Sequence, residues 1–503
     1  MTRIKIIIYA LFVFGQLSAK EIVVERPAFS VRNNDFFEIE KIVMDKNATT
    51  LHIRGYANWS GWNKVDRNIY LMVDGKEYPV QNFVNLESGK KIEVDENGEY
   101  SFSLIFPPIP AKTKRFDLCT RSKDWMIWDV ELKSPKKNRK PSTAHIPDEF
   151  IKAAIIKEDG KGLEAPQWKA ADARLKGVIA GFKPEMGQHG VVVFVSNMIT
   201  GKSETYLTNV NADGTFELAV PMTVTQQVGF RVVGKGDKAL VNDFIVLSPD
   251  EETRICFDLP AWFRKLTHQR YNEQIEPKIL YFTGAHAEIN NQYFDANYSH
   301  HIQKMTDACY GNDSIFKMTV PEYREHGMNA RNRCFADLIN NHPSLTRKTK
   351  EFFRIELDYH LAYYLYYIKQ NMNLAYRRFH HISNPYTDTE LILPHLDEDY
   401  FSYLNHLPLN HPVSLYFNNY AYALTWCRFF NIANDTNQKS LTDILESSEG
   451  LFFDLIKCQE VSASFERMTP LTEAHIKQLK QMKEPFFAEY IILLNEKLLT
   501  RIE

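Results

Sequence analysis

The sequence predicts a multidomain α+β protein, with two antiparallel β-sandwich domains followed by an all-α helical domain. Before residue 260, apolar and polar residues alternate in short runs separated by turn residues, which is typical of half-buried strands. After Pro260, apolar residues recur at spacings of three and four, which is the period of a helix. The segments that we expect are a signal peptide at 1–19, an N-terminal β-sandwich at 20–135, a linker at 136–171, a second β-sandwich at 172–259 and a helical domain at 260–503.

Length and composition exclude several classes of protein. The chain has 503 residues, of which 44% are apolar and 24% charged, and this excludes wholesale disorder, collagen and a multispan membrane protein. Its 60 Lys and Arg residues nearly balance 63 Asp and Glu residues, giving a formal net charge of −3. That balance gives no reason to expect a nucleic acid or an anionic membrane as the partner. Six cysteines are too few for a disulfide scaffold.

The first twenty residues have the pattern of a secretory signal peptide. Arg3 and Lys5 are followed by the apolar run 6–14, which is too short to span a bilayer, and then by the small residue Ala19. The alternative is an N-terminal core strand. We expect cleavage near Ala19 and a periplasmic or secreted protein. No later run is long and apolar enough to predict a transmembrane segment.

Four features predict the first β domain. Residues 49–56 alternate between apolar and polar side chains, and so do residues 99–106. Asp74 and Gly75 separate two short apolar runs, and Asp-Gly at that position predicts a hairpin because both turn residues need a positive φ. Residues 125–132 supply a last strand.

A basic, proline-broken stretch at 133–141 separates the two β regions. A nucleic-acid or lipid patch is one interpretation, and export together with the balanced total charge favours the other, a solvated connector. Beyond it, residues 190–195 form a buried-strand run, and the turn 211–214 leads into the alternating run 215–220. Short strands with turns between them predict a second sandwich.

The helical region has recognisable starts. Ser344 or Thr346 can cap a helix, and Pro470 is expected in the first turn of another. Residues 486–502 form a last helix. The helix after the Ser344/Thr346 cap carries a broad apolar face, made by Phe352, Phe353, Leu357, Leu361, Tyr364, Leu365 and Ile368.

The cysteines do not predict redox chemistry. They are Cys119, Cys256, Cys309, Cys334, Cys427 and Cys458. A redox dithiol needs two thiols within one helical turn, and no Cys-x-x-Cys occurs. Cys427 lies on an apolar helical stripe, which favours a buried core thiol. After export, the sequence leaves open a disulfide between Cys309 and Cys334 or between Cys427 and Cys458.

The best metal candidate is His395 with Asp397, Glu398 and Asp399. The alternative, which we favour, is a solvated acidic first turn of a helix, where negative charge suits the helix dipole. The sequence has no phosphate-binding Gly-rich loop, no Gly-x-Ser-x-Gly elbow and no His-Glu-x-x-His. We therefore expect no catalytic residue, cofactor or metal ion in this chain.

Three groups of motifs carry a family resemblance. They are Phe37–Ile42 with Ile105–Pro110, Val195–Gly201 with Asn209–Phe216 and Val220–Pro221, and Thr469–Thr472 with Pro485–Tyr490. Together they resemble the N-terminal region of large exported thiol–disulfide oxidoreductases of the TlpA/ResA-like type, in the thioredoxin family. In that family a thioredoxin domain with Trp-Cys-x-x-Cys follows the helical region, and no position here matches that motif. Residues 172–259 also resemble transthyretin-like, carboxypeptidase-regulatory-type sandwiches.

The resemblance implies a non-catalytic exported accessory protein that binds a protein or peptide partner in the cell envelope. Two alternatives stay open, a cell-envelope glycan-binding protein and a truncated disulfide reductase whose redox domain lies downstream. An enzyme with an unrecognised site is a third. The candidate binding surface comprises Trp59, Trp62, Tyr364 and Tyr367. The two tryptophans would form a stacking platform on a sandwich edge, and the alternative for them is a tryptophan-bearing hairpin loop. The two tyrosines would line a sugar or peptide groove. For the two tyrosines, helical spacing favours a place in the core.

Overall fold

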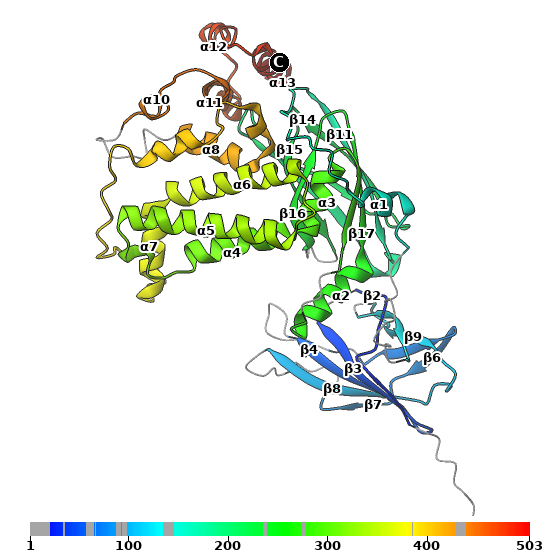
Figure 1. Cartoon of the computed structure of the whole chain (residues 1–503). Coiled ribbons are helices and arrows are strands. Elements are labelled where there is room, and N and C mark those ends of the chain that lie inside the picture. The colour runs from blue at the N-terminus through cyan, green and yellow to red at the C-terminus, as the bar shows by residue number, and fades with distance from the viewer. Residues whose placement is uncertain are drawn as a thin grey trace, which may run out of the picture. The chain divides into compact units, whose positions relative to one another are not determined.

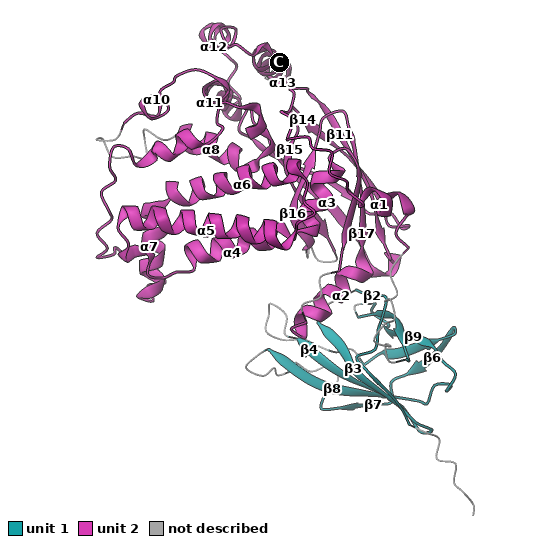
Figure 2. Cartoon of the chain, viewed as in Figure 1, with its two compact units in different colours: residues 1–144 teal, residues 145–503 magenta. Residues whose placement is uncertain are grey.

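The computed structural model describes residues 21–33, 36–56, 65, 67–86, 92, 98–123, 125–133, 145–234, 239–273, 277–384, 386–428 and 439–502. The chain divides into two compact units, residues 1–144 and 145–503, coloured separately in Figure 2. The fold is mixed α+β, with the sheets mainly in the N-terminal half and the helices mainly in the C-terminal half (Figure 1). This confirms the predicted class at that level.

In unit 1 the described strands form two five-stranded antiparallel sheets. The first has the order β1 (Ile22–Glu25), β3 (Phe37–Met44), β4 (Thr49–Tyr56), β8 (Glu99–Phe106), β7 (Asn82–Val84). The second has the order β2 (Val31–Arg32), β10 (Ile127–Glu131), β9 (Arg115–Thr120), β5 (Ile69–Val73), β6 (Lys76–Pro79).

The sequence pattern explains these strands. Strand β4 buries every second residue, as its alternation predicts. The β5–β6 hairpin turns at Asp74 and Gly75, whose φ angles are 47° and 79°, so both turn residues are left-handed as predicted. Leu51 of the first sheet and Leu118 of the second are fully buried in one shared core. The two sheets therefore stabilise each other through their apolar faces.

Unit 2 begins with a short helix, α1 (Asp148–Ala153), and contains two four-stranded sheets within its described residues. One has the order β14 (Thr215–Met222), β11 (Ala171–Ala180), β17 (Glu252–Asp258), β18 (Leu280–Gly284). The other has the order β13 (Ser203–Asn209), β12 (Gly190–Ser196), β15 (Gln226–Val233), β16 (Ala239–Leu247). The pair β11–β17 is parallel, with Gly177 opposite Ile255, so this sheet is not purely antiparallel as predicted. Alternation shows which face of a strand is buried but not the direction of its neighbour.

Most of the remaining helices come after β17 in the chain, whereas η1 lies between β11 and β12. They are η1 (Pro184–Met186), α2 (Leu259–Arg270), α3 (Ala287–Asp295), α4 (Tyr298–Tyr310), η3 (Ile315–Lys317), α5 (Val320–Asn341), α6 (Arg347–Tyr366), α7 (Ile368–Phe379), η4 (Tyr400–His406), η5 (Pro412–Tyr416), α8 (Asn418–Arg428), α10 (Leu441–Ile444), α11 (Leu451–Ser462), η6 (Ala463–Arg467), α12 (Glu473–Leu479) and α13 (Pro485–Ile502). Figure 1 shows α4, α5, α6 and α8 side by side next to the sheets of unit 2. Among the helices of the described residues, none has a run long and apolar enough to cross a bilayer.

Side-chain caps fix where several helices begin. Thr346 caps α6 by accepting a hydrogen bond from the Thr349 amide, as the sequence predicts. Helix α12 begins at Glu473, because Thr472 forms its cap by accepting from the His475 amide. Pro470 therefore lies before this helix and not in its first turn.

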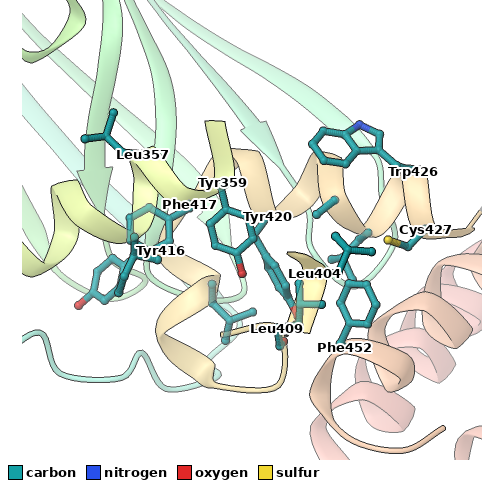
Figure 3. Packing of buried hydrophobic residues seen from close by; sticks show 14 of the residues in the cluster. Leu357, Tyr359, Leu404, Leu409, Tyr416, Phe417, Tyr420, Trp426, Cys427 and Phe452 are labelled. Carbon is teal, nitrogen blue, oxygen red and sulfur yellow. Dashed lines mark hydrogen bonds between the residues drawn. The ribbon is translucent and has the colours of Figure 1, made fainter. Parts of the chain in front are cut away.

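Helices and sheets of unit 2 share one core. Met198 and Val246 from the sheet region belong to the same buried cluster as the aromatic residues of α6 and α8. Figure 3 shows Tyr359, Phe417 and Tyr420 packed together, with ring centroids 6.0 Å apart for Tyr359–Phe417 and 5.8 Å for Tyr359–Tyr420. Each large apolar side chain buried in this way contributes about 1.5–3 kcal/mol before the entropy of ordering the chain is subtracted.

Candidate functional site

All six cysteines lie in the described part of the chain, and each is a buried, free thiol. Burial raises the pKa of Cys334 to about 11 and the pKa of Cys119, Cys256, Cys309 and Cys427 to about 12. Since the thiolate is the nucleophile in disulfide exchange, buried thiols that stay protonated near neutral pH do not start such a reaction.

Neither of the disulfides that the sequence left open is formed. The Cys334 thiol donates to the carbonyl oxygen of His301 at 3.4 Å. Cys309 is close to Cys334, because Cys334 adds to the rise that burial causes in the pKa of Cys309. The Cys458 sulfur lies 3.5 Å from the sulfur of Met482, while Cys427 lies in the aromatic cluster of Figure 3.

The four aromatic residues of the predicted binding surface do not meet in the described structure. Trp59 and Trp62 lie outside the described residues. Tyr364 is 1% exposed and stacks on Tyr323 with ring centroids 4.4 Å apart, so it belongs to the contact between α5 and α6. Tyr367 is half-buried and packs against Trp426 of α8, with centroids 6.0 Å apart. The two tyrosines therefore face different neighbours.

The acidic stretch near His395 is engaged in an ion pair. Asp399 precedes η4 and pairs with Lys439, with 2.6 Å between Oδ1 and Nζ. Across the described residues, no three His, Cys, Asp or Glu side chains converge closely enough to hold a metal ion.

A groove on the helical face of unit 2 is the site that sequence reasoning missed. It has a volume of about 440 Å³ and lies between α5, α6 and η4. Its lining residues are Arg324, Met328, Arg331, Asn332, Asp358, Leu361, Ala362, Leu365, Ser402, Tyr403, His406 and Leu407. The lining combines apolar side chains with charged groups, as small-ligand and peptide sites commonly do.

The groove is lined by two arginines but by one aspartate, Asp358. Arg331 forms an ion pair with Asp358 at 2.6 Å, and Arg354 approaches the other oxygen of that carboxylate at 3.5 Å. Burial raises the pKa of Asp358, and the two arginines oppose that shift. Asp358 is thus shared between two cations.

The second arginine of the lining, Arg324, is held in a different way. Its Nη2 donates to the backbone oxygen of Tyr400 at 2.9 Å, and its guanidinium lies 5.4 Å from the centre of the Tyr400 ring. No carboxylate of the described residues lies within ion-pair distance of Arg324, and its buried Nε has no partner there. The groove therefore has an excess of positive charge, on a side chain whose position is fixed by a ring and a carbonyl group.

One sequence signal for this groove existed. Arg324, Met328 and Arg331 are spaced by four and three residues, which places them on one face of α5. The opposing residues lie at positions 358 to 407, in and next to α6 and η4, and only the fold brings them to α5.

Comparison with known proteins gives no family for this chain. No family model matches the sequence, and no curated protein matches it. A crystal structure of a pullulanase from Anoxybacillus sp. LM18-11 is similar over 40% of this chain and 24% of that chain, with 12% identity and a TM-score of 0.15. The chain thus spans about a quarter of that protein's length, and a similarity at this TM-score carries no argument about fold or function.

Proposed function

We propose that this chain is a non-catalytic exported binding protein, related to the N-terminal region of TlpA/ResA-like thiol–disulfide oxidoreductases. In this proposal it consists of two β-sandwich domains and a helical domain, and it acts in the periplasm or outside the cell after removal of its signal peptide. It binds a protein or peptide partner through the groove between α5, α6 and η4.

The observation that supports this proposal is the chemistry of the groove. Apolar side chains such as Met328 and Leu361 lie beside Arg324 and Arg331, with one carboxylate, that of Asp358, to balance them. A peptide segment with acidic and large apolar side chains complements both properties, because the apolar contacts give affinity and the charges give orientation. The burial of all six thiols favours binding over disulfide exchange.

A direct test measures the fluorescence anisotropy of a labelled peptide of alternating glutamate and leucine, titrated with the mature protein. We expect binding that weakens as salt is added, since partly exposed charges are screened. The variant Arg324→Gln should weaken binding roughly tenfold, because one charge-assisted hydrogen bond to the peptide is lost. The matched control is Arg333→Gln, on the same helix but outside the groove.

A peptide of alternating lysine and leucine serves as the charge-reversed probe. The proposal is contradicted if the lysine peptide binds as tightly as the glutamate peptide. It is also contradicted if Arg324→Gln and Arg333→Gln weaken binding equally, because the groove would then contribute nothing specific.

A further inference from the structure

A second cavity of unit 2 shares no lining residue with the groove. It has a volume of about 290 Å³ and lies between the β16 strand, helices α2 and α3, and the start of α4. Its polar groups include Asn242, Asp243, Gln269 and Ser299, and Trp262 forms part of its wall. These residues come from three separate elements, β16, α2 and α4, so the cavity exists only in the folded chain.

Asp243 is held in this cavity by three donors that all bond one of its oxygens. Its Oδ1 accepts from the Tyr293 hydroxyl at 3.0 Å, the Ser299 hydroxyl at 2.5 Å and the Phe244 amide at 2.8 Å. The Tyr293 and Ser299 oxygens are themselves 3.1 Å apart, so they also fix each other. The carboxyl group is therefore rigid before any ligand arrives, which lowers the entropic cost of binding.

The other oxygen of Asp243, Oδ2, makes no hydrogen bond to any part of the chain that the structure describes. This oxygen is not fully enclosed by protein, and Asp243 lines the cavity, so a bound molecule can reach it. A carboxylate oxygen is a strong acceptor, and on this half-buried residue Oδ2 keeps its full capacity to accept. It is thus poised to accept a hydrogen bond from a bound molecule.

Among the described residues of the lining, positive and negative side chains are equal in number. Lys278 pairs with Asp295, and Lys265 acts on Asp243 by opposing the rise that burial causes in the pKa of that carboxyl. Two lysines thus face two aspartates, which favours an occupant without net charge, because an ion would have to compete with the existing partners.

The rest of the lining combines aromatic and amide groups. Trp262, Tyr293 and Phe294 supply aromatic surface, and Gln269 and Asn242 supply donors and acceptors. Aromatic rings pack against C–H groups while amides and carboxylates bond hydroxyl groups. We infer that this cavity binds a small uncharged polyhydroxylated molecule, about the size of a monosaccharide, with one ligand hydroxyl donating to Oδ2 of Asp243.

The test uses saturation-transfer NMR on the mature protein with four separate probes: glucose, myo-inositol, propylammonium and glutamate. At least one of the two neutral polyols should receive saturation, and the two ions should receive less. The variant Asp243→Asn keeps an acceptor for the three donors but places an amide N–H where Oδ2 was, so polyol binding should weaken roughly tenfold. Asp307→Asn, an exposed position on α4 outside the cavity, is the matched control.

A second variant distinguishes loss of the binding site from loss of the folded structure. Gln269→Trp places an indole at an exposed position of the rim and breaks no buried hydrogen bond, so it should obstruct the cavity while thermal unfolding stays unchanged. Arg324→Gln, in the separate groove, should leave polyol binding as in the original chain. The inference is overturned if no polyol binds, if an ion binds better, or if Asp243→Asn and Gln269→Trp bind polyol normally.

Discussion

Replacement of Glu356 by glutamine should make the protein more stable at alkaline pH. Glu356 lies on α6 and is 3% exposed, and its Oε1 accepts from the Gln227 side-chain amide at 2.9 Å. Burial raises the pKa of Glu356 to about 8, with a smaller contribution from the negative charge of Asp243. Glutamine keeps the shape of the side chain and the acceptor for Gln227 but cannot ionise.

The size of the effect follows from proton linkage. The folded pKa, about 8, lies above the ordinary value of 4.5, so between these values the folded chain holds a proton that the unfolded chain releases. The free energy of unfolding therefore falls as pH rises through this window, by roughly 3–4 kcal/mol between about pH 5 and about pH 8 at about 1.4 kcal/mol per unit. Below the unfolded pKa, Glu356 is protonated in both states, and above the folded pKa it is ionised in both. Outside the window between them, this residue therefore gives the free energy of unfolding no further dependence on pH.

Urea unfolding followed by circular dichroism, at several pH values, measures this difference. The two proteins should be equally stable within about 1 kcal/mol near pH 5, and Glu356→Gln should be the more stable one near pH 8. The control Glu325→Gln changes an exposed carboxylate on α5 and should follow the original chain at every pH. Parallel curves for the original chain and Glu356→Gln would refute the reasoning, because they would mean that Glu356 ionises normally in the folded state.

Two further substitutions probe the sheets of unit 2. In Gly177→Ala the new Cβ would contact the Phe216 ring and lie 2.7 Å from the backbone oxygen of Ile255, so we expect a loss of about 1–3 kcal/mol in urea unfolding. An unchanged midpoint would show that β14 and β17 can shift relative to β11 at low cost. Asn291→Ala removes a fully buried amide that bonds both the N–H and the C=O of Phe282, and thermal unfolding should show a loss of about 2–3 kcal/mol. A loss below about 1 kcal/mol would mean that water replaces the amide.

Local features of the fold were predictable because short-range chemistry fixes them. The β5–β6 hairpin depends on Asp74 and Gly75, which tolerate a positive φ, and the start of α6 depends on Thr346, whose side chain bonds the next turn. The strand β18 (Leu280–Gly284) was not predicted, since its five residues lie in a region with helical spacing. Its place beside β17 depends on antiparallel pairing with that strand, which a sequence period does not encode.

The two cavities were less predictable than the elements that form them. Arg324 and Arg331 share a helix, so their common face can be read from their spacing. Asp243, Trp262 and Ser299 are up to 56 positions apart and meet only because β16, α2 and α4 pack together. Residues that converge from separate elements leave no periodic signal in a single sequence.

The thiols test the central claim, that this chain binds a partner and does not exchange disulfides. The measurement is the reaction of the native protein with Ellman's reagent near neutral pH, compared with the same protein in guanidinium chloride. We expect all six thiols to react at once in the denaturant and all of them to react slowly in the native protein, because each is buried. Rapid reaction of two thiols in the native protein, with insulin reduction that depends on them, would contradict the account.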